Sequence, residues 1–331
     1  MSRSYRLFPG VTACISLLAA AQAVGVQQTV TGVTNALLWV DLLRAWRYCS
    51  TDAPFKPYMK ELYTPNGVNV LLDAPPDHLH HHGLMFACAV NNVDFWGEAP
   101  GPADGHFERV PGKQQHLRFV DVPVPLRVDE CCPEFAESIR WVSQPKNEPL
   151  LLERRLIATD KLRKKEAALL TWESKLSVPE EKDSVVLSGS HYHGLGLRFI
   201  RSMDATGEFR NADNDPGVIF RGEERLSRSK WCAYTAQANG KTVTVAMFDD
   251  PGNPRHPATW FTMAKPFAYL SATLRLHEEP LQVLTGKPLR LRYAVALWDG
   301  RAETAQIEDL YKYWIAALAV VDQTAKTIPE W

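Results

Sequence analysis

The chain has 331 residues, of which 45% are hydrophobic and 23% are charged, a composition typical of a globular protein with a sizeable core. Its 37 basic and 38 acidic residues nearly cancel, giving a formal net charge of −1 and no support for electrostatic capture of nucleic acid. Beyond residue 23, no stretch approaches the ~18 apolar residues of a membrane span. We therefore expect neither a nucleic-acid partner nor a membrane span, and the sequence assigns no oligomeric state.

The first residues, 1–23, are expected to be a signal peptide. Two arginines precede the apolar stretch 7–21, and Ala21-Gln22-Ala23 has the small-x-small pattern of a cleavage site. A lipoprotein signal at Cys14 is the alternative, which we disfavour because the apolar run before this cysteine is short and interrupted. The mature protein, residues 24–331, is therefore expected in the periplasm or outside the cell.

The segment between the signal and residue 73 fits more than one structure. Residues 35–48 fit either a helix or two short strands. Residues 56–62 predict a strand, and Thr64-Pro65-Asn66-Gly67 predicts a turn. The alternating residues 67–72 then lead into a run of histidines.

Four of the ten histidines lie within residues 78–82. Pro75-Pro76 disfavours a helix at this point, so we predict an extended segment at the start of a strand. Side chains alternate in such a segment, which would place His81 on the face opposite the other three histidines. Imidazole titrates near neutral pH and binds metals, so the run predicts proton transfer or metal binding. A solvated loop without function is the alternative.

The rest of the chain predicts an all-β domain followed by a helix. Short segments rich in Val, Leu, Thr and aromatic residues recur between Pro, Gly, Asn or Asp, as is typical of strands. Their number indicates one large antiparallel β-sandwich or barrel. Residues 303–321 instead carry apolar side chains at helical spacing. The strands are predicted at 115–126, 137–142, 150–159, 167–178, 184–190, 194–201, 231–237, 242–248, 267–276 and 289–298.

Two further segments carry residues suited to catalysis or binding. His191 and His193 would share one face of a strand, beside glycines that let a ligand approach closely. Residues 252–257 form a proline-bounded turn that presents Arg255 and His256. Arginine can bind a carboxylate or vicinal hydroxyls through two N–H groups. A salt bridge that pins the loop is an equally good interpretation of this arginine.

Carboxylates are needed beside these histidines for acid/base chemistry. Glu208 is the one we select, because Asp94 and Asp299 stand in turns where carboxylates commonly cap backbone N–H groups. No cofactor is required for such chemistry. A divalent metal at the histidine cluster, held by histidines from two strands, is the alternative. Motifs of serine hydrolases, phosphate-binding loops and His-Glu-x-x-His zinc enzymes are absent from the sequence.

Short motifs spread over residues ~46–300 carry a family resemblance. They are Lys56-Pro57-Tyr58, Asp77-His78-x-His80-His81-x-Gly83-Leu84, Asn92-Val93-Asp94-Phe95-Trp96, Gly194-Leu195-Gly196-x-Arg198, Gly252-Asn253-Pro254-Arg255, Trp260-Phe261, Leu291-Arg292-Tyr293 and Asp299-Gly300. On these motifs the chain resembles the PmoA-like family of secreted bacterial proteins, often labelled methane oxygenase. The family often has Arg at the position of His82 and Trp at that of Met85, a departure that favours His80 and His81 as functional residues.

The β-rich pattern is also similar to galactose-mutarotase-like sandwiches, which implies a carbohydrate ligand. We therefore expect a carbohydrate-active enzyme, a hydrolase, lyase or epimerase. A non-catalytic carbohydrate-binding module and a metal-dependent oxidoreductase are the alternatives. The expected catalytic residues are His80, His81 and His193, and the expected substrate-binding residues are Arg255, His256, His191, Trp96 and Glu208.

Overall fold

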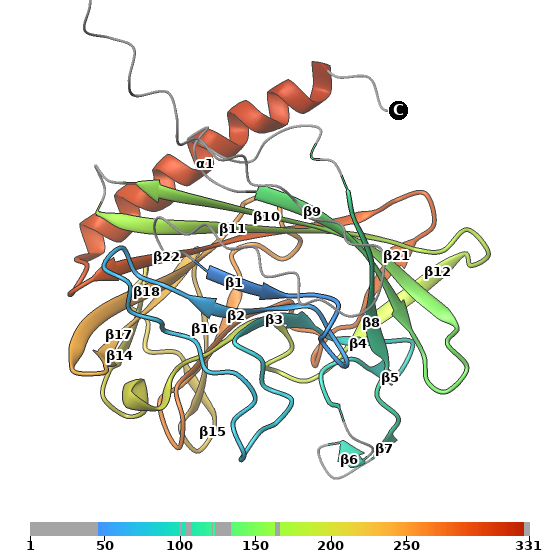
Figure 1. Cartoon of the computed structure of the whole chain (residues 1–331), viewed down its shortest axis with the longest axis horizontal. Helices are drawn as coiled ribbons and strands as arrows, with labels where there is room; N and C mark the ends of the chain where they lie inside the picture. Colours follow the sequence, from blue (N-terminus) through green and yellow to red (C-terminus); the bar gives the residue numbers. More distant parts are fainter. Residues whose placement is uncertain are drawn as a thin grey trace, which may run out of the picture. The chain divides into compact units, whose positions relative to one another are not determined.

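The computed structural model describes residues 46–98, 101–103, 107–120, 122, 134–162 and 166–327, all within one compact unit, residues 33–331. The expected signal peptide lies outside the described residues. Two antiparallel eight-stranded sheets dominate (Figure 1). In spatial order, sheet 1 contains β1 (Trp46–Cys49), β2 (Tyr58–Leu62), β3 (Leu84–Ala87), β13 (Gly194–Arg198), β20 (Tyr269–Thr273), β19 (Thr259–Met263), β16 (Glu224–Arg228) and β15 (Val218–Arg221).

Sheet 2 is built mostly from longer strands. Its three central strands, β22, β11 and β10, are 11, 11 and 14 residues long and pair in register. Sheet 2 contains, in spatial order, β14 (Glu208–Asn211), β17 (Trp231–Ala238), β18 (Lys241–Asp249), β22 (Leu289–Asp299), β11 (Ala167–Ser177), β10 (Pro149–Leu162), β9 (Glu134–Val142) and β8 (Lys113–Val120).

Smaller elements complete the described part of the chain. A four-stranded sheet and a two-stranded sheet lie beside the larger ones, and a short 3-10 helix follows β13. Their bounds are β21 (Leu281–Leu284), β12 (Ser184–Ser188), β4 (Ala89–Val90), β5 (Val93–Asp94), β6 (Gly101–Ala103), β7 (Phe107–Arg109) and η2 (Arg201–Met203).

The main core lies between the two large sheets. Strand side chains alternate between two faces, so each strand sends every second residue into this core. In β19, Trp260 points into it, whereas Phe261 belongs to a separate apolar cluster on the opposite face of sheet 1. In β20, Leu270 and Tyr269 divide in the same way. Sheet 1 therefore has a second, outward-facing apolar surface.

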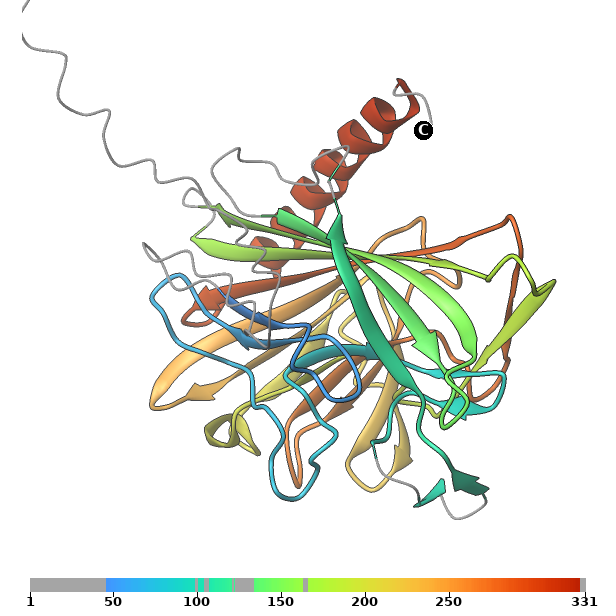
Figure 2. The same cartoon turned by 45° about the vertical axis from the view of Figure 1, so that its right-hand side comes forward.

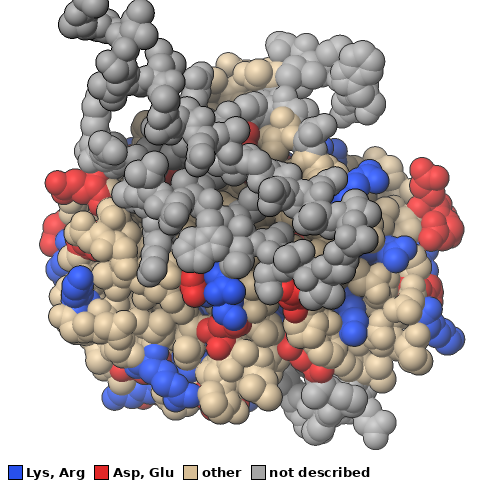
Figure 3. Space-filling view, in the orientation of Figure 1, with Lys and Arg blue, Asp and Glu red and all other residues tan. Residues whose placement is uncertain are grey.

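Helix α1 (Thr304–Thr327) covers the outer face of sheet 2, as both views show (Figures 1 and 2). Its side chains Ile307, Leu310, Trp314 and Leu318 recur at helical spacing and are buried against small residues of the sheet. Within the described residues, no helix has the length and apolarity of a membrane span. On the face in Figure 3, basic and acidic side chains are interspersed rather than gathered into a patch of one sign.

The predicted architecture, an antiparallel β-sandwich with a C-terminal helix, is confirmed. Most predicted strands are present within a few residues of their expected bounds. Strands β5, β6, β7, β14, β15, β16, β19 and β21 were not predicted. The ambiguous segment 35–48 ends in strand β1, and its residues 35–45 lie outside the described part. The extended conformation predicted for residues 78–82 is wrong, because turns occupy this segment.

Candidate functional site

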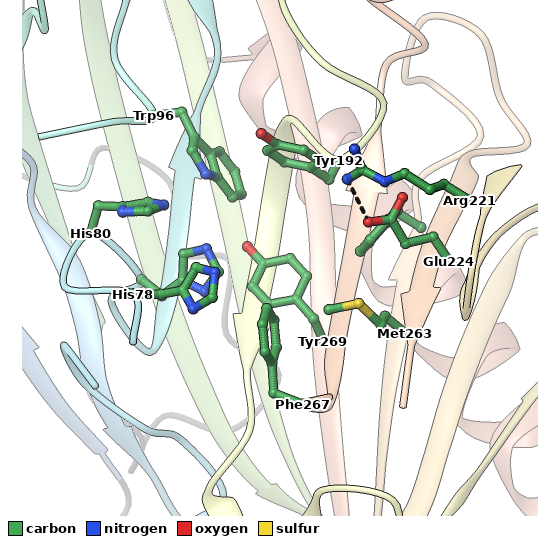
Figure 4. Close-up of a pocket in the computed structure, with 11 residues that line it drawn as sticks. His78, His80, Trp96, Tyr192, Arg221, Glu224, Met263, Phe267 and Tyr269 are labelled. Carbon is green, nitrogen blue, oxygen red and sulfur yellow. Dashed lines mark hydrogen bonds and ion pairs between the residues drawn. The ribbon is translucent and has the colours of Figure 1, made fainter. Parts of the chain in front are cut away.

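A cavity of about 270 Å³ opens on the outward face of sheet 1. Ligand pockets commonly measure ~300–1,000 Å³, so this one is at the small end of that range. Figure 4 shows histidines on one side of the cavity, an arginine–glutamate pair on the opposite side and aromatic rings between them. The lining residues are His78, His80, His81, Trp96, Tyr192, Arg221, Glu224, Phe261, Met263, Phe267 and Tyr269.

The histidine side of the cavity is a closed loop between Leu72 and Gly83. The Gly83 N–H donates to the Leu72 carbonyl at 3.1 Å, and the Ala74 N–H donates to the His81 carbonyl at 2.9 Å. Within the loop, two successive turns are closed by the N–H groups of His78 and His81. These turns bend the histidine run, so His78, His80 and His81 all line the cavity. Bending replaces the alternation of faces that an extended strand would impose.

The three cavity histidines pack against one another. The rings of His78 and His81 stack with centroids 4.6 Å apart, and His80 meets His81 edge-on at 4.6 Å. Burial lowers the pKa of His80 to about 4 and holds the pKa of His81 well below its usual range. Both imidazoles are therefore neutral at pH 7. A neutral imidazole can accept a proton at one ring nitrogen and donate one at the other.

His82 has a different environment from its neighbours. Its Nδ1 lies 2.7 Å from Asp73 Oδ1, its Nε2 lies 2.9 Å from Glu98 Oε1, and its ring stacks on Tyr58. Burial opposes protonation, but the hydrogen bonds to the two carboxylates outweigh it and raise the pKa of His82. Glu98 also pairs with the buried ammonium of Lys56 at 2.5 Å. His82 thus anchors the histidine loop to Asp73 and Glu98.

His82→Gln is expected to destabilise the protein in a pH-dependent way. Because the pKa of His82 is higher in the folded state than in the unfolded state, protonation of this ring stabilises the fold. This stabilisation is complete below the unfolded-state pKa of ~6.5 and is lost as the pH rises through the folded-state pKa. The difference in unfolding free energy between wild type and variant should therefore shrink from pH 6 to pH 9, as measured by urea denaturation. His78→Gln, which alters a partly exposed ring paired with Asp77, is the control. A pH-independent difference would contradict the imidazolium assignment.

Three residues that line the cavity each carry a buried polar atom with no hydrogen-bond partner among the described residues. The atoms are His81 Nδ1, Trp96 Nε1 and Tyr269 Oη, and all three side chains are more than nine-tenths buried. Figure 4 shows the Tyr269 hydroxyl pointing toward the side of the cavity that holds Trp96 and the histidines. A side chain at Gly196 would collide with this hydroxyl, so the glycine leaves room for the Tyr269 ring. Buried polar atoms usually have partners, so these three are suited to binding a ligand.

The opposite side of the cavity comes from the hairpin β15–β16. Arg221 Nη2 lies 2.8 Å from Glu224 Oε1, and His191 Nε2 lies 3.0 Å from Glu224 Oε2. Both carboxylate oxygens are therefore held, one by a guanidinium and one by an imidazole. Burial lowers the pKa of His191, so this ring is neutral at pH 7 and donates its Nε2–H to Glu224. Its Nδ1 then accepts from the Ser190 hydroxyl at 3.2 Å.

Of the other residues selected from sequence, Trp96 lines the cavity and His193 does not. His193 is only 1% exposed, and its ring stacks on Trp96 with centroids 5.0 Å apart. Gly189 leaves space for this imidazole, since a side chain there would collide with it. His193 therefore supports the Trp96 ring instead of forming part of the cavity wall. His191 does not line the cavity either, but it holds the carboxylate of Glu224, which does.

Three predicted substrate-binding residues lie away from the cavity lining. Arg255 donates to the carbonyls of Leu274 and Glu279 at 2.5 and 2.7 Å, which is the loop-pinning role that the sequence left open. His256 Nδ1 lies 2.6 Å from Asp249 Oδ2. Glu208 is exposed on β14 and pairs with arginines at the edge of sheet 2. None of these three lines the cavity.

The donor set at the histidine cluster does not fit a divalent metal. Metal-binding imidazoles direct their nitrogens to one point at ~2.0–2.1 Å. Here His78 and His81 stack face to face, and His82 is occupied by two carboxylates. Across the described ranges, no group of three or more His, Cys, Asp and Glu residues is placed to hold a metal ion.

Several cavity residues were not selected from sequence. Arg221 and Glu224 flank Gly222 in a short polar hairpin, and this arginine–turn–glutamate arrangement is the signal that would have found them. Tyr192 stands between His191 and His193, the two histidines that were selected. Tyr269 lies in a predicted strand but carries no sequence signal for function.

The comparisons with known proteins concern the fold and the family. A galactosidase domain of the α-galactosidase–sucrose kinase AgaSK is 10% identical, with a TM-score of 0.38 over 65% of this chain and 30% of that one. The α-galactosidase from Lactobacillus brevis is 10% identical, with a TM-score of 0.39 over 82% and 40%. A putative mutarotase (YeaD) from Salmonella typhimurium is 10% identical, with a TM-score of 0.36 over 78% and 95%.

These scores are too low to carry a conclusion about substrate or reaction. The chain also spans less than half the length of the two galactosidase chains. No curated protein matches the chain. These comparisons give no support to the resemblance to the PmoA-like family. A model of a family of unknown function, DUF6807, matches residues 39–312, and the chain therefore belongs to this family.

Proposed function

We propose that this protein binds a carbohydrate in the cavity on sheet 1 and acts on it by histidine-assisted acid/base chemistry. The observation that carries the proposal is the combination of aromatic rings with the three unpartnered atoms His81 Nδ1, Trp96 Nε1 and Tyr269 Oη. Sugars present apolar C–H faces and hydroxyl groups side by side, which need an apolar wall with a few placed polar groups. The N–H of Trp96 and the O–H of Tyr269 can donate hydrogen bonds, and the imidazole nitrogen of His81 can donate or accept one. Sugar hydroxyl groups, which both donate and accept, are suitable partners for all three.

The acid/base roles fall to groups on opposite sides of the cavity. His80 and His81 are neutral at pH 7, so each has one ring nitrogen free to accept a hydrogen bond or a proton from a sugar hydroxyl, and His80, whose pKa is lowered less, is the stronger base of the two. Glu224, opposite them, has its carboxylate oriented by Arg221 and His191. Hydrolysis, β-elimination and epimerisation all need such a pair of proton-transferring groups. His193, Arg255, His256 and Glu208 have no role in contacting substrate in this proposal.

A non-catalytic carbohydrate-binding module is the second candidate. It is favoured by the same aromatic lining and needs no proton transfer. The metal-dependent oxidoreductase suggested by the PmoA-like label has less support, because the cavity histidines stack instead of converging. We also propose, on the sequence of residues 1–23, that the protein acts in the periplasm or outside the cell.

Trp96→Ala and Glu224→Gln together separate the two candidates. Trp96→Ala removes an aromatic wall and a hydrogen-bond donor, so sugar affinity should fall roughly tenfold or more by calorimetry with a panel of free mono- and disaccharides. Glu224→Gln should retain binding and lower turnover by about 10²–10⁴-fold, measured by polarimetry and reducing-end release. Glu208→Gln, an exposed carboxylate outside the cavity, is the control and should change neither.

The outcomes discriminate clearly. Binding without turnover of any sugar in the panel, unaffected by Glu224→Gln, would support the binding module. Unchanged affinity in Trp96→Ala would place the ligand elsewhere and contradict the proposal. Circular dichroism and thermal unfolding of each variant establish that it is folded.

A further inference from the structure

An apolar strand borders the cavity on its Arg221 side. In β15, Val218, Ile219 and Phe220 are 75%, 58% and 47% exposed. The other exposed large hydrophobic residues in the described part of the chain are isolated in sequence. Scattered apolar residues are normal on a protein surface, whereas a continuous apolar patch commonly marks a binding site.

The apolar run of β15 is divided between the two faces of sheet 1. Val218 pairs with Leu226, which packs on the outward-facing apolar cluster, whereas Ile219 pairs with Arg225 on the other face. Val218 and Phe220 are therefore the apolar side chains on the cavity face.

The strand is continuous with the cavity through direct contacts. Arg221, the last residue of β15, lines the cavity and pairs with Glu224. The Phe220 ring stacks on His191 with centroids 3.8 Å apart, and His191 in turn holds Glu224. Any ligand that fills the cavity and extends past Arg221 would meet this strand first.

The opposite rim is also apolar at its outermost point. Leu79 is 65% exposed and stands between His78 and His80, which both line the cavity. Arg221 and Glu224, at the boundary between the cavity and β15, carry opposite charges that cancel in their ion pair. This pair therefore adds no net charge to the apolar region just outside the cavity. These features suit an uncharged apolar group attached to the ligand.

The edge of sheet 1 at β15 is poorly suited to pairing with another strand. β15 has four residues, and its pairing with β16 is irregular between Ile219 and Arg221. Short, irregular edge strands resist the addition of further strands. The side chains, rather than the free backbone groups, are then the binding feature. This favours a small apolar group over a second copy of the chain.

We propose that the ligand of the cavity is a glycoside with an uncharged alkyl or aryl aglycone, and that β15 binds this aglycone. The sugar ring occupies the cavity, and the aglycone leaves it past Arg221 and packs on Val218 and the Phe220 ring. This inference rests on the proposed carbohydrate function and adds the class of the group attached to the sugar.

The test compares matched glycosides that differ only in the aglycone. Calorimetry would use methyl and n-octyl β-D-glucopyranoside and the same pair of galactopyranosides, below the concentration at which the octyl compounds form micelles. We expect an octyl glycoside to bind wild type at least about tenfold more tightly than its methyl counterpart, since burying several methylene groups is favourable. In Val218→Ser this ratio should fall at least about threefold, with methyl glycoside affinity unchanged. Ile219→Ser, on the other face of the sheet, should keep the ratio. Phe220 is left intact because it contacts His191.

The matched control is Val186→Ser/Leu284→Ser, which removes two exposed apolar side chains from the smaller β12–β21 sheet and should keep the ratio. Equal affinities for both aglycones in wild type, or a ratio that survives Val218→Ser, would overturn the inference while leaving the carbohydrate function standing. Binding of none of the four compounds would count against both. A dimer in light scattering that Val218→Ser dissociates would show instead that β15 joins two copies.

Discussion

Arg155→Met is expected to destabilise the protein by about 3–5 kcal/mol, because it leaves buried carboxylates without their cation. Arg155 and Glu153 are both completely buried and form two hydrogen bonds, at 2.8 and 3.0 Å. The guanidinium also donates to the Tyr48 hydroxyl at 3.0 Å, and Tyr48 in turn donates to the buried Glu137 at 2.5 Å. Removing the guanidinium therefore affects two carboxylates in the core between the sheets.

Urea denaturation at pH 7 measures this effect. Arg47→Met, which removes the arginine of the partly exposed Arg47–Glu61 pair at 3.8 Å, is the control and should cost no more than about 1 kcal/mol. Adding Glu153→Gln to Arg155→Met should recover part of the loss, because one buried charge is then removed. A loss below about 1 kcal/mol for Arg155→Met would show that the network contributes little to stability.

Trp314→Ala should cost about 3–5 kcal/mol by opening a cavity between helix α1 and sheet 2. Trp314 is 1% exposed, donates from Nε1 to the Thr171 hydroxyl at 3.1 Å and packs near Phe248. Thermal and urea unfolding measure the loss. Lys312→Ala, on the exposed side of the same helix, should change stability by less than about 0.5 kcal/mol. Equal effects from the two variants would mean that α1 contributes little to the fold.

Two of the longest predicted strands combine Leu and Ala with a few aromatic residues over eleven positions. Residues 167–177 and 289–299 are buried on both faces, by the core on one side and α1 on the other. The unpredicted hairpin 218–228 lies at an edge, and its apolar run Val218–Phe220 is only three residues long and is followed by charged residues, so it gives a weak strand signal. Its strand structure depends on pairing with β19, a contact that no local pattern encodes.

The candidate site could be predicted only on its histidine side. The dense histidine run and Pro75-Pro76 are local features, whereas the direction of each ring depends on the two turns that close the loop. The Arg221–Glu224 side comes from a hairpin about 140 residues further along the chain and reaches the cavity only through the fold. Arg255 was misassigned because its partner carbonyls lie in residues 274–280, which the sequence gives no reason to place beside it.

Glu98 has a consequence for how this protein could be re-engineered. Its carboxylate binds both His82, in the histidine loop, and Lys56, which also donates to the Trp96 carbonyl at 3.1 Å. The histidine loop and Trp96 are thus connected through the partly buried Glu98 carboxylate. Arg221, by contrast, extends from a hairpin whose outer strand is largely exposed. Substitutions on that hairpin should therefore change ligand preference at little cost in stability, while the histidine loop held by Glu98 tolerates few replacements.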